Sequence, residues 1–182
     1  LWLAFDGRLD NRPDLLDQLG PLDPQVPDAA LALAAFARWG EGAGARLLGD
    51  FAFVAWDGAA RRLVCCRDHL GIRPLYYHAS PARFVCASEI AQVLAHPAVP
   101  REPDLATVAD HLACDVRNGG GTLYRHVSRV PPGHAVIAEP GRIRIERYWA
   151  PEPRSPIRYR DDEAYAAHCR ELLGRSVAAR LR

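Results

Sequence analysis

The sequence of 182 residues contains no methionine and no lysine. A chain that starts at Leu1 and lacks every Met predicts that residues upstream of it are missing. Arginine supplies all of the fixed positive charge, and the formal net charge of +1 gives no electrostatic reason to expect a nucleic-acid partner. No apolar run approaches the ~18 residues that span a bilayer, and no basic segment followed by an apolar one marks a signal peptide. We therefore expect neither nucleic acid nor a membrane as a partner.

Cysteine is scarce, and its five positions are odd in number and follow no spacing typical of a metal site. Cys65, Cys66 and Cys86 lie in apolar segments, where a thiol behaves as a small buried hydrophobe. The other two, Cys114 and Cys169, fall on predicted helices. We expect no metal centre and a cytoplasmic location.

The chain is organised around the stretch Gly49–Tyr77. Charges there fall at the turns, where Arg67-Asp68 is expected to form a structural ion pair or a turn cap. A meander of apolar strands must be covered on both faces, so we expect one central sheet between other layers. Runs of aromatic and β-branched residues predict its strands at 51–56, 63–66, 75–77 and 84–87.

The remaining elements follow from hydrophobic periodicity and from turn residues. Leu1–Phe5 predicts a buried strand. We expect helices at 12–19, 29–39, 90–94 and 105–114, and a hairpin of strands at 135–137 and 142–146. Residues 1–150 are therefore one domain, followed by a proline-rich linker at 151–160 and a final helix over 161–182.

Several motifs extend over nearly the whole chain: D-G-R-L-D-N at 6–11, G-D-F-A-F-V-A-W-D and L-V-C-C-R-D-H-L-G-I-R-P-L-Y-Y within 49–77, A-S-E-I at 87–90, T-L-Y-R-H-V-S-R-V-P-P-G-H at 122–134 and R-Y-W at 147–149. In this order and at these spacings they resemble the glutaminase domain of the glutamine-hydrolysing asparagine synthetase family. That domain is a class II, or N-terminal-nucleophile (Ntn), glutamine amidotransferase. The resemblance implies an α+β fold, an Ntn-hydrolase-like αββα sandwich of two mostly antiparallel sheets over residues 1–150.

The resemblance also implies a glutamine pocket at Asp6, Gly7 and Arg8. The family has an Asn-Gly pair that donates hydrogen bonds to the oxyanion of the tetrahedral intermediate, so Asp6 and Gly7 are the candidate catalytic residues. The Gly7 N–H can still donate, whereas an ionised Asp6 cannot and would repel the oxyanion. The family's Glu after the glycine is Arg8 in this chain. The alternative interpretation is that Asp6-Gly7 is only a tight turn between a strand and a helix.

Asp28 matches the aspartate with which the family holds the α-amino group of glutamine. The resemblance therefore gives four candidate glutamine-binding residues: Asp6, Gly7, Arg8 and Asp28. The alternative is that Asp28 is simply the N-cap of the helix that follows it.

In this family a cysteine at the mature N-terminus attacks the carboxamide of glutamine, with its own α-amino group as the general base. Leu1 is not that nucleophile, and we expect none of the five cysteines to replace it because all lie within predicted strands or helices. The resemblance thus implies a domain that lacks its N-terminal part. We expect the chain by itself not to hydrolyse glutamine.

The resemblance further implies that ammonia passes to a C-terminal synthetase domain, where ATP and Mg²⁺ activate an aspartate side chain for amidation. Residues 161–182 would be the first helix of that ATP-binding domain, and the chain itself would hold no cofactor. Glutamine and the synthetase domain are the expected partners, and a homodimer is left open. The alternative function is a degenerate, non-hydrolysing scaffold domain of a related amide-forming ligase, such as a lasso peptide macrolactam synthetase or a β-lactam synthetase. The departures at Asp6 and Arg8 favour this alternative.

Overall fold

The computed structural model describes residues 1–115, 120–152 and 156–181. The chain forms two compact units, Leu1–Ala150 and Pro151–Arg182. Residues 153–155 of the predicted linker, and Arg182 at the end of the predicted final helix, lie outside the described residues.

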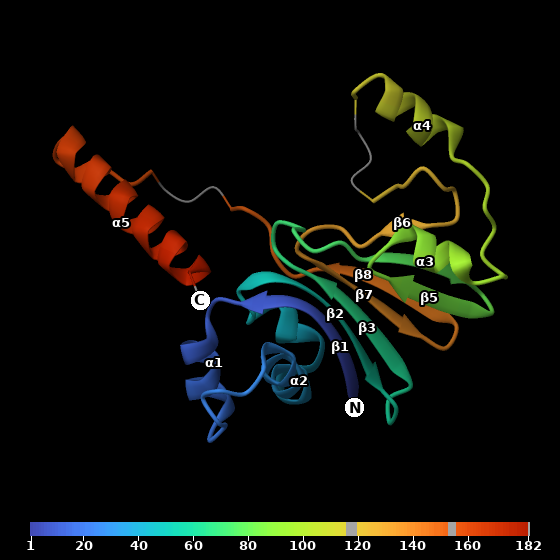
Figure 1. Ribbon diagram of the computed structural model, residues 1–182, viewed down its shortest axis with the longest axis horizontal. Helices are drawn as coiled ribbons and strands as arrows, with labels where there is room; N and C mark the ends of the chain where they lie inside the picture. Colours follow the sequence, from blue (N-terminus) through green and yellow to red (C-terminus); the bar gives the residue numbers. More distant parts are fainter. Residues whose placement is uncertain (116–119, 153–155, 182) are drawn as a thin grey trace. The chain divides into compact units, whose positions relative to one another are not determined.

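The first unit contains both strands and helices (Figure 1). In chain order they are β1 (Trp2–Leu9), α1 (Arg12–Leu19), α2 (Asp28–Trp39), the 3₁₀ helix η1 (Gly40–Ala45), β2 (Gly49–Asp57), β3 (Arg62–Arg67), β4 (Tyr76–Ser80), β5 (Arg83–Ala87), α3 (Ile90–Ala95), α4 (Leu105–Leu112), β6 (Ser128–Arg129), β7 (His134–Glu139) and β8 (Arg142–Arg147). The strands build a five-stranded sheet of order β1-β2-β3-β7-β8 and a three-stranded sheet of order β5-β4-β6. Every strand pair in both sheets is antiparallel.

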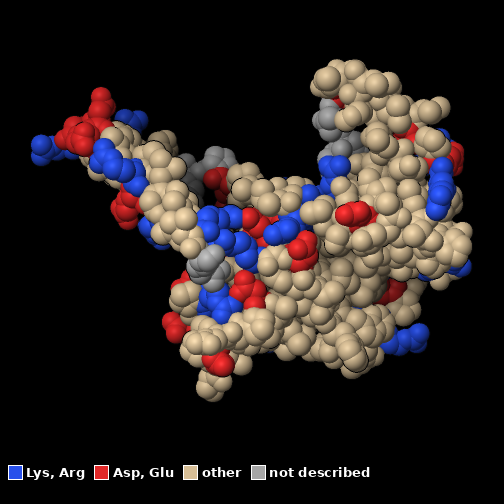
Figure 2. Space-filling model, viewed as in Figure 1, with Lys and Arg blue, Asp and Glu red and all other residues tan. Residues whose placement is uncertain are grey.

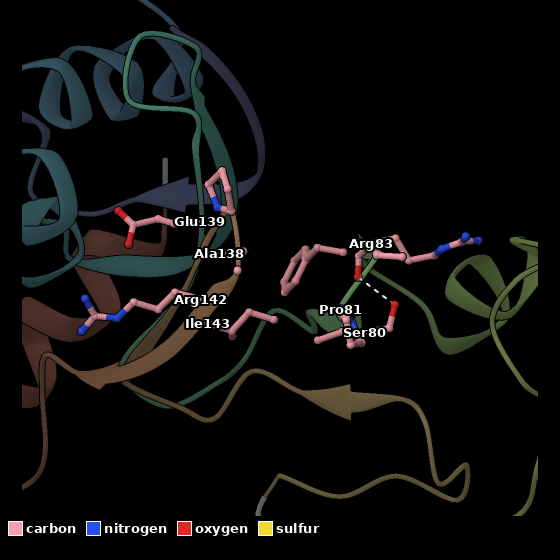
Figure 3. A pocket seen from close by; sticks show the side chains of 12 residues that line it. Ser80, Pro81, Arg83, Ala138, Glu139, Arg142 and Ile143 are labelled. Atoms are coloured by element: carbon pink, nitrogen blue, oxygen red, sulfur yellow. Dashed lines mark hydrogen bonds between the residues drawn. The ribbon is translucent and has the colours of Figure 1, made fainter.

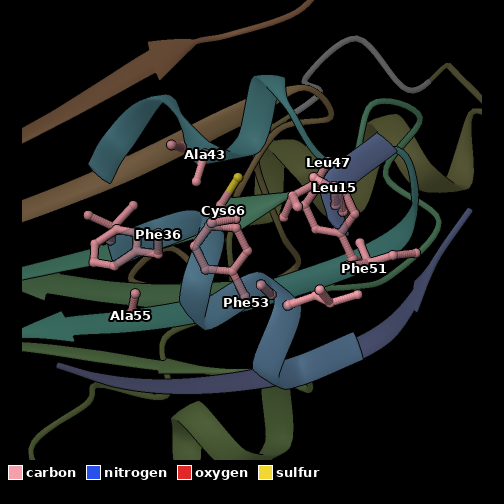
Figure 4. Packing of buried hydrophobic residues seen from close by; sticks show 14 of the residues in the cluster. Leu15, Phe36, Ala43, Leu47, Phe51, Phe53, Ala55 and Cys66 are labelled. Carbon is pink, nitrogen blue, oxygen red and sulfur yellow. The ribbon is translucent and has the colours of Figure 1, made fainter. Parts of the chain in front are cut away.

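The two sheets lie between two layers of helices, and three hydrophobic clusters fill the spaces between the layers. The first cluster joins α1 and α2 to one face of the five-stranded sheet, where the Phe36 ring of α2 meets the Phe53 ring of β2 edge to face (Figure 4). The second cluster lies between the sheets and includes Cys65 of β3 and Leu75. The third packs α3, through Val93, against the outer face of the smaller sheet. These layers form the expected αββα sandwich.

Strand β2 shows how the sequence produces this layering. Successive side chains on a strand point to opposite faces. Phe51 and Phe53 therefore pack in the cluster on the helix side, while Ala52 packs in the cluster between the sheets. An apolar residue at nearly every position is what a strand buried on both faces requires.

The predicted single central sheet is wrong, because the meander divides between the two sheets. β2 and β3 belong to the larger sheet, whereas β4 and β5 belong to the smaller one, and β3 pairs on its other edge with β7. The strands themselves are where the periodicity places them, apart from β4. That strand begins at Tyr76 and continues to Ser80, beyond the predicted segment 75–77.

The turn between β3 and β4 explains the change of sheet. Asp68 is buried, with 1% of its surface exposed, and its carboxylate accepts hydrogen bonds from the backbone N–H groups of Leu70, Ile72 and Arg73. The guanidinium of Arg67 donates to the carbonyl oxygens of Arg73, Gly71 and Val130. The turn-cap interpretation of this pair is thus confirmed for Asp68, and the fixed turn leads the chain into the second layer.

Within residues 151–152 and 156–181, the described part of the second unit, there is one helix, α5 (Asp162–Arg180), which Asp161 caps by accepting from the N–H of Ala164. The predicted final helix is confirmed over these residues, and its apolar side chains Leu172, Leu173 and Val177 are exposed. Cys169 lies on it as expected, but Cys114 of the first unit follows the end of α4 instead of lying within a helix. Among the described residues, no helix has the length and apolarity needed to cross a bilayer.

Candidate functional site

A pocket of about 340 Å³ opens between the two sheets, beside the segment that the resemblance assigns to glutamine binding. Strands β1 and β2 form one wall, while Leu75, just before β4, joins the end of β5 in forming the other. Its lining residues are Ala4, Phe5, Asp6, Ala52, Phe53, Val54, Leu75, Cys86, Ala87 and Ser88. Asp6 is the one acidic group in this lining. The pocket is therefore the candidate site.

A larger hollow of about 550 Å³ lies between the β4–β5 turn and the β7–β8 turn (Figure 3). The charged side chains at its rim, Arg83, Glu139 and Arg142, point away from the space between the turns. Small or apolar residues such as Ala138 and Ile143 remain to line it. This arrangement brings no set of polar groups together, so it is a weaker candidate for chemistry.

Asp6 lies inside β1, opposite Ala52 of β2. Residues paired across antiparallel strands project to the same face, and Ala52 belongs to the cluster between the sheets. Asp6 consequently faces the inter-sheet pocket. Its carboxylate forms an ion pair with the guanidinium of Arg73, Oδ1 to Nη1 3.5 Å, in which both side chains are nearly half exposed. The interpretation of Asp6-Gly7 as a turn is wrong, because β1 continues past both residues to Leu9.

Gly7 occupies a position that only glycine tolerates. Its φ is +141°, and a Cβ added there would lie 2.1 Å from the carbonyl oxygen of Asp50 on the neighbouring strand. Such a distance is far inside van der Waals contact, and the contacted atom is backbone that cannot turn aside. The close approach of β1 to β2 beside Asp6 therefore depends on this glycine.

Arg8 does not line the pocket. Its Nε donates to Oδ1 of Asp10 at 3.1 Å, and a quarter of its side chain is exposed. Asp10 is nearly buried, with 9% of its side chain exposed, so this ion pair belongs to the end of β1. Arg8 is therefore close in sequence to the pocket residue Asp6, but its side chain pairs with Asp10 and is not part of the pocket lining.

Asp28, the first residue of α2, connects that helix to strand β1 and to helix α1. One carboxylate oxygen accepts from the backbone N–H of Leu9 at 2.8 Å, and the other forms an ion pair with Arg12 of α1. Arg12 also donates to the carbonyl oxygens of Pro24 at 2.9 Å and Val26 at 2.7 Å. The N-cap interpretation of Asp28 is wrong, because Pro27 precedes α2 as its N-cap and Asp28 is the first helical residue.

The four predicted residues therefore gather around the second half of β1 without forming one cluster. Asp6 lines the pocket, and Gly7 follows it in β1 without being part of the lining. Arg8 pairs with Asp10, and the carboxylate of Asp28 is bound to the strand through Leu9. Sequence reasoning missed Arg73, which supplies the positive charge opposite Asp6. A signal for it was present in the G-I-R-P turn, but its pairing with a residue 67 positions earlier depends on the fold.

The cysteines in β3 have the properties of core residues. Cys65 and Cys66 are both fully buried, on opposite faces of the larger sheet. Burial raises the pKa of the Cys66 thiol well above its ordinary value, because the thiolate would lose its hydration. A thiol of this kind is a poor nucleophile.

Comparison with known proteins agrees with the geometry. The family described as glutamine amidotransferase domain matches residues 1–149. The glutamine-hydrolyzing asparagine synthetase 3 of Bacillus subtilis (strain 168) is 28% identical over 183 residues, which cover 98% of this chain and 30% of that protein. Amidase chyE of Penicillium rubens is 30% identical over 155 residues, covering 85% of this chain and 22% of that protein. The chain thus spans less than a third of the length of these curated relatives.

Among solved structures, the glutamine phosphoribosylpyrophosphate amidotransferase from Bacillus subtilis, complexed with ADP and GMP, is similar with a TM-score of 0.54 and 22% sequence identity. The similarity covers 84% of this chain and 30% of that chain. At this identity the likeness shows the fold, and it confirms the Ntn-hydrolase-like sandwich of two antiparallel sheets. The match over residues 1–149 goes further: the chain belongs to the family of glutamine amidotransferase domains and is related to the asparagine synthetases.

Proposed function

We propose that this chain is the glutaminase domain of an amide-forming ligase, and that the parent protein uses glutamine as the nitrogen donor for the ATP-dependent amidation of aspartate. The observation that carries the proposal is the position of Asp6 at a pocket between the sheets, with Gly7 next to it in β1, in a chain that belongs to the glutamine amidotransferase domains. The asparagine synthetase of Bacillus subtilis, which aligns with 98% of the chain, supports the choice of reaction.

Hydrolysis of a carboxamide passes through a tetrahedral intermediate with a negatively charged oxygen, which must be met by hydrogen-bond donors. We assign the donor role to the Gly7 backbone. Asp6 brings a carboxylate to the same place, and its repulsion of the oxyanion is reduced by the guanidinium of Arg73 at 3.5 Å. An ion pair this exposed contributes only about 0–1 kcal/mol because water screens it, so Arg73 weakens this repulsion without removing it.

Asp28 is the proposed partner of the glutamine α-amino group. A carboxylate offers about four acceptor positions, and each of its oxygens accepts one hydrogen bond, from Leu9 or Arg12. Acceptor capacity therefore remains for an ammonium group. Arg8, the fourth proposed glutamine-binding residue, would have to exchange its bond with Asp10 for a contact with the substrate.

The nucleophile is proposed to be a cysteine at the mature N-terminus of the whole protein, as the family resemblance implies. The chain of 182 residues alone should then release no glutamate from glutamine. We further propose that α5 is the first helix of a synthetase domain that binds ATP and Mg²⁺, and that this domain is the partner of the amidotransferase unit. A homodimer of the whole protein remains a proposal of the same kind.

The alternative is a non-hydrolysing scaffold domain of a related amide-forming ligase. One observation favours it: Asp6 puts a carboxylate where the family has an amide, and Arg73 is placed to stabilise that carboxylate rather than a substrate. In this case the parent enzyme would use no glutamine. The two functions differ in a measurable product, glutamate.

The test compares glutamate release by the full-length protein with release by its Asp6→Asn variant. If the domain is a glutaminase, restoring the amide removes one negative charge and adds one donor. The rate should rise by ~10-fold or more, because a single oxyanion donor contributes about 10²–10³ in kcat. Asp17→Asn, an equal charge change at an exposed position of α1, should leave the rate unchanged. An active wild type whose rate is unchanged or lowered by Asp6→Asn would show that Asp6 does not face the oxyanion.

A further inference from the structure

Helix α4 turns its apolar side away from the protein. A helix on the surface of a globular protein normally packs its apolar stripe against the core and leaves its polar side to water. In α4 this arrangement is reversed. Leu105 and Leu112 are 71% and 79% exposed, whereas the polar residues Thr107 and Asp110 are half-buried. No residue of α4 is fully buried, so the helix adds little to the core of the first unit.

The outward side of α4 is one apolar surface. The exposed apolar residues of the helix and its C-cap are Leu105, Ala106, Ala109, Leu112 and Ala113. Residues three and four apart are neighbours on a helix surface, so these side chains form a continuous surface, called the α4 patch below. In Figure 2 the region of α4, at the top right, shows almost no Lys, Arg, Asp or Glu side chains. Such a surface favours a partner that is itself apolar.

The beginning of α4 is held in place by the segment that precedes β6. The backbone N–H of Asp104 donates to the carbonyl oxygen of Leu123 at 2.9 Å, and the N–H of Arg125 donates to the carbonyl oxygen of Glu102 at 3.0 Å. The side chains of Glu102 and Arg125 also form an ion pair. The carboxylate of Asp104 caps the helix by accepting from two N–H groups of its first turn. These bonds fix the direction in which α4 presents its apolar side.

The α4 patch is too small to hold a separate protein by itself. A helix of 8 residues is about 12 Å long and about 10 Å wide. One side of it offers only a fraction of the roughly 800 Å² that each partner buries in a stable interface. A domain of the same polypeptide has an effective concentration on the order of millimolar, so a small surface is enough to bind it. The size of the patch therefore favours a covalently linked partner over a second copy of the chain.

We propose that the α4 patch is a docking surface for the synthetase domain of the same polypeptide, through a part of that domain outside these 182 residues. The inference rests on the proposed function, which supplies this domain as the partner. The asparagine synthetase 3 of Bacillus subtilis supports it, because 98% of this chain matches only 30% of that protein. Most of that relative thus lies outside the matched part. The docked surface should present apolar side chains to Leu105 and Leu112.

The experiment measures how fast N-ethylmaleimide modifies single cysteines on α4 in the native full-length protein. All variants carry Cys114→Ser, so that the peptide 102–117, released by cleavage after arginine, contains one cysteine in each. Leu105→Cys and Leu112→Cys lie in the α4 patch. His111→Cys is the matched control, because position 111 is exposed on the same helix but outside the patch. We expect the two patch variants to react ~10-fold or more slowly than the control, since a covered thiol reacts only when the interface opens.

Equal rates in the three variants would overturn the proposal. Protection that grows with protein concentration would do so as well, because a second copy would then cover the patch. Glutamate release and amide formation from glutamine, measured on the same proteins, separate this inference from the proposed function. If amide nitrogen is transferred while the patch stays open to the reagent, the docking surface is wrong and the function stands. If the patch is protected at every protein concentration but no glutamate is released from glutamine, the docking surface stands and the function is wrong.

Discussion

Replacement of Asp68 tests the physical account of the turn that carries the chain from one sheet to the other. Oδ1 of its buried carboxylate accepts hydrogen bonds from the backbone N–H groups of Leu70 at 3.1 Å and Ile72 at 3.0 Å. Oδ2 accepts one from the N–H of Arg73 at 2.9 Å. Asp68→Asn keeps the shape but turns one oxygen into a donor. The amide can satisfy the two N–H groups at Oδ1, so a single hydrogen bond is lost.

Removing one hydrogen bond to a buried charged group costs about 1.5–3 kcal/mol. We therefore expect Asp68→Asn to lower the free energy of unfolding by about 2 kcal/mol. Asp68→Ala removes all three bonds and should cost about 3–5 kcal/mol, since water replaces some of them at the exposed side of the loop. The assay is urea unfolding followed by tryptophan fluorescence, because all four tryptophans (Trp2, Trp39, Trp56 and Trp149) belong to the first unit.

Asp57 provides the matched control for this measurement. Its Oδ1 accepts the N–H groups of Ala59 and Ala60 at 3.1 Å each, but in a turn open to water. Asp57→Asn should cost only about 0.5–1 kcal/mol, because water reaches this partly exposed side chain and the pair it loses with Arg62, at 3.7 Å, is also partly exposed. If Asp68→Asn destabilises the first unit no more than Asp57→Asn does, burial of the cap is not what makes this turn rigid, and the reasoning fails.

Two further predictions concern the first unit. Gly7→Ala should lower its free energy of unfolding by about 3 kcal/mol or more in the same assay, since the new Cβ meets the Asp50 carbonyl oxygen and φ is positive. A decrease below about 1 kcal/mol would mean that β1 and β2 separate easily at this position. His69 packs its ring edge to face against Tyr148 and Trp149, and burial lowers its pKa. In the unfolded chain the histidine has its ordinary pKa of about 6.5, so between that pH and the lower folded-state pKa the unfolded chain binds more protons than the folded one. The contribution of His69 to stability therefore falls as the pH drops through this window. His69→Phe keeps the ring contacts and should make the loss of stability on acidification smaller, and an unchanged acid limb of the stability profile would contradict this role.

The strands and the layers could largely be predicted from the sequence. Burial of β2 on both faces follows from an unbroken apolar run, and the sandwich follows from the family resemblance. The assignment of strands to sheets could not be predicted, because it depends on the turn at Asp68. That turn is fixed by bonds to distant residues, such as the donation from Arg67 to Val130 and the acceptance by the Asp68 carbonyl oxygen from the N–H of Gly133.

The candidate site shows the same division. The sequence indicated Asp6 and Gly7, but the Asp-Gly pair alone favours a turn. Pairing with β2 overrides that local preference and keeps both residues in the strand. The ion pair of Asp6 with Arg73 and the bond from Leu9 to Asp28 join residues far apart in the chain, and no local pattern encodes them.

The most direct test of the proposed function follows nitrogen through the full-length protein. The protein would be incubated with ATP, Mg²⁺, aspartate and glutamine labelled with heavy nitrogen in its amide group, and glutamate and labelled product would be measured together. The account predicts glutamate release and heavy nitrogen in the new amide. Amide formation from unlabelled ammonium alone, with no glutamate released from glutamine, would contradict it and favour the scaffold function.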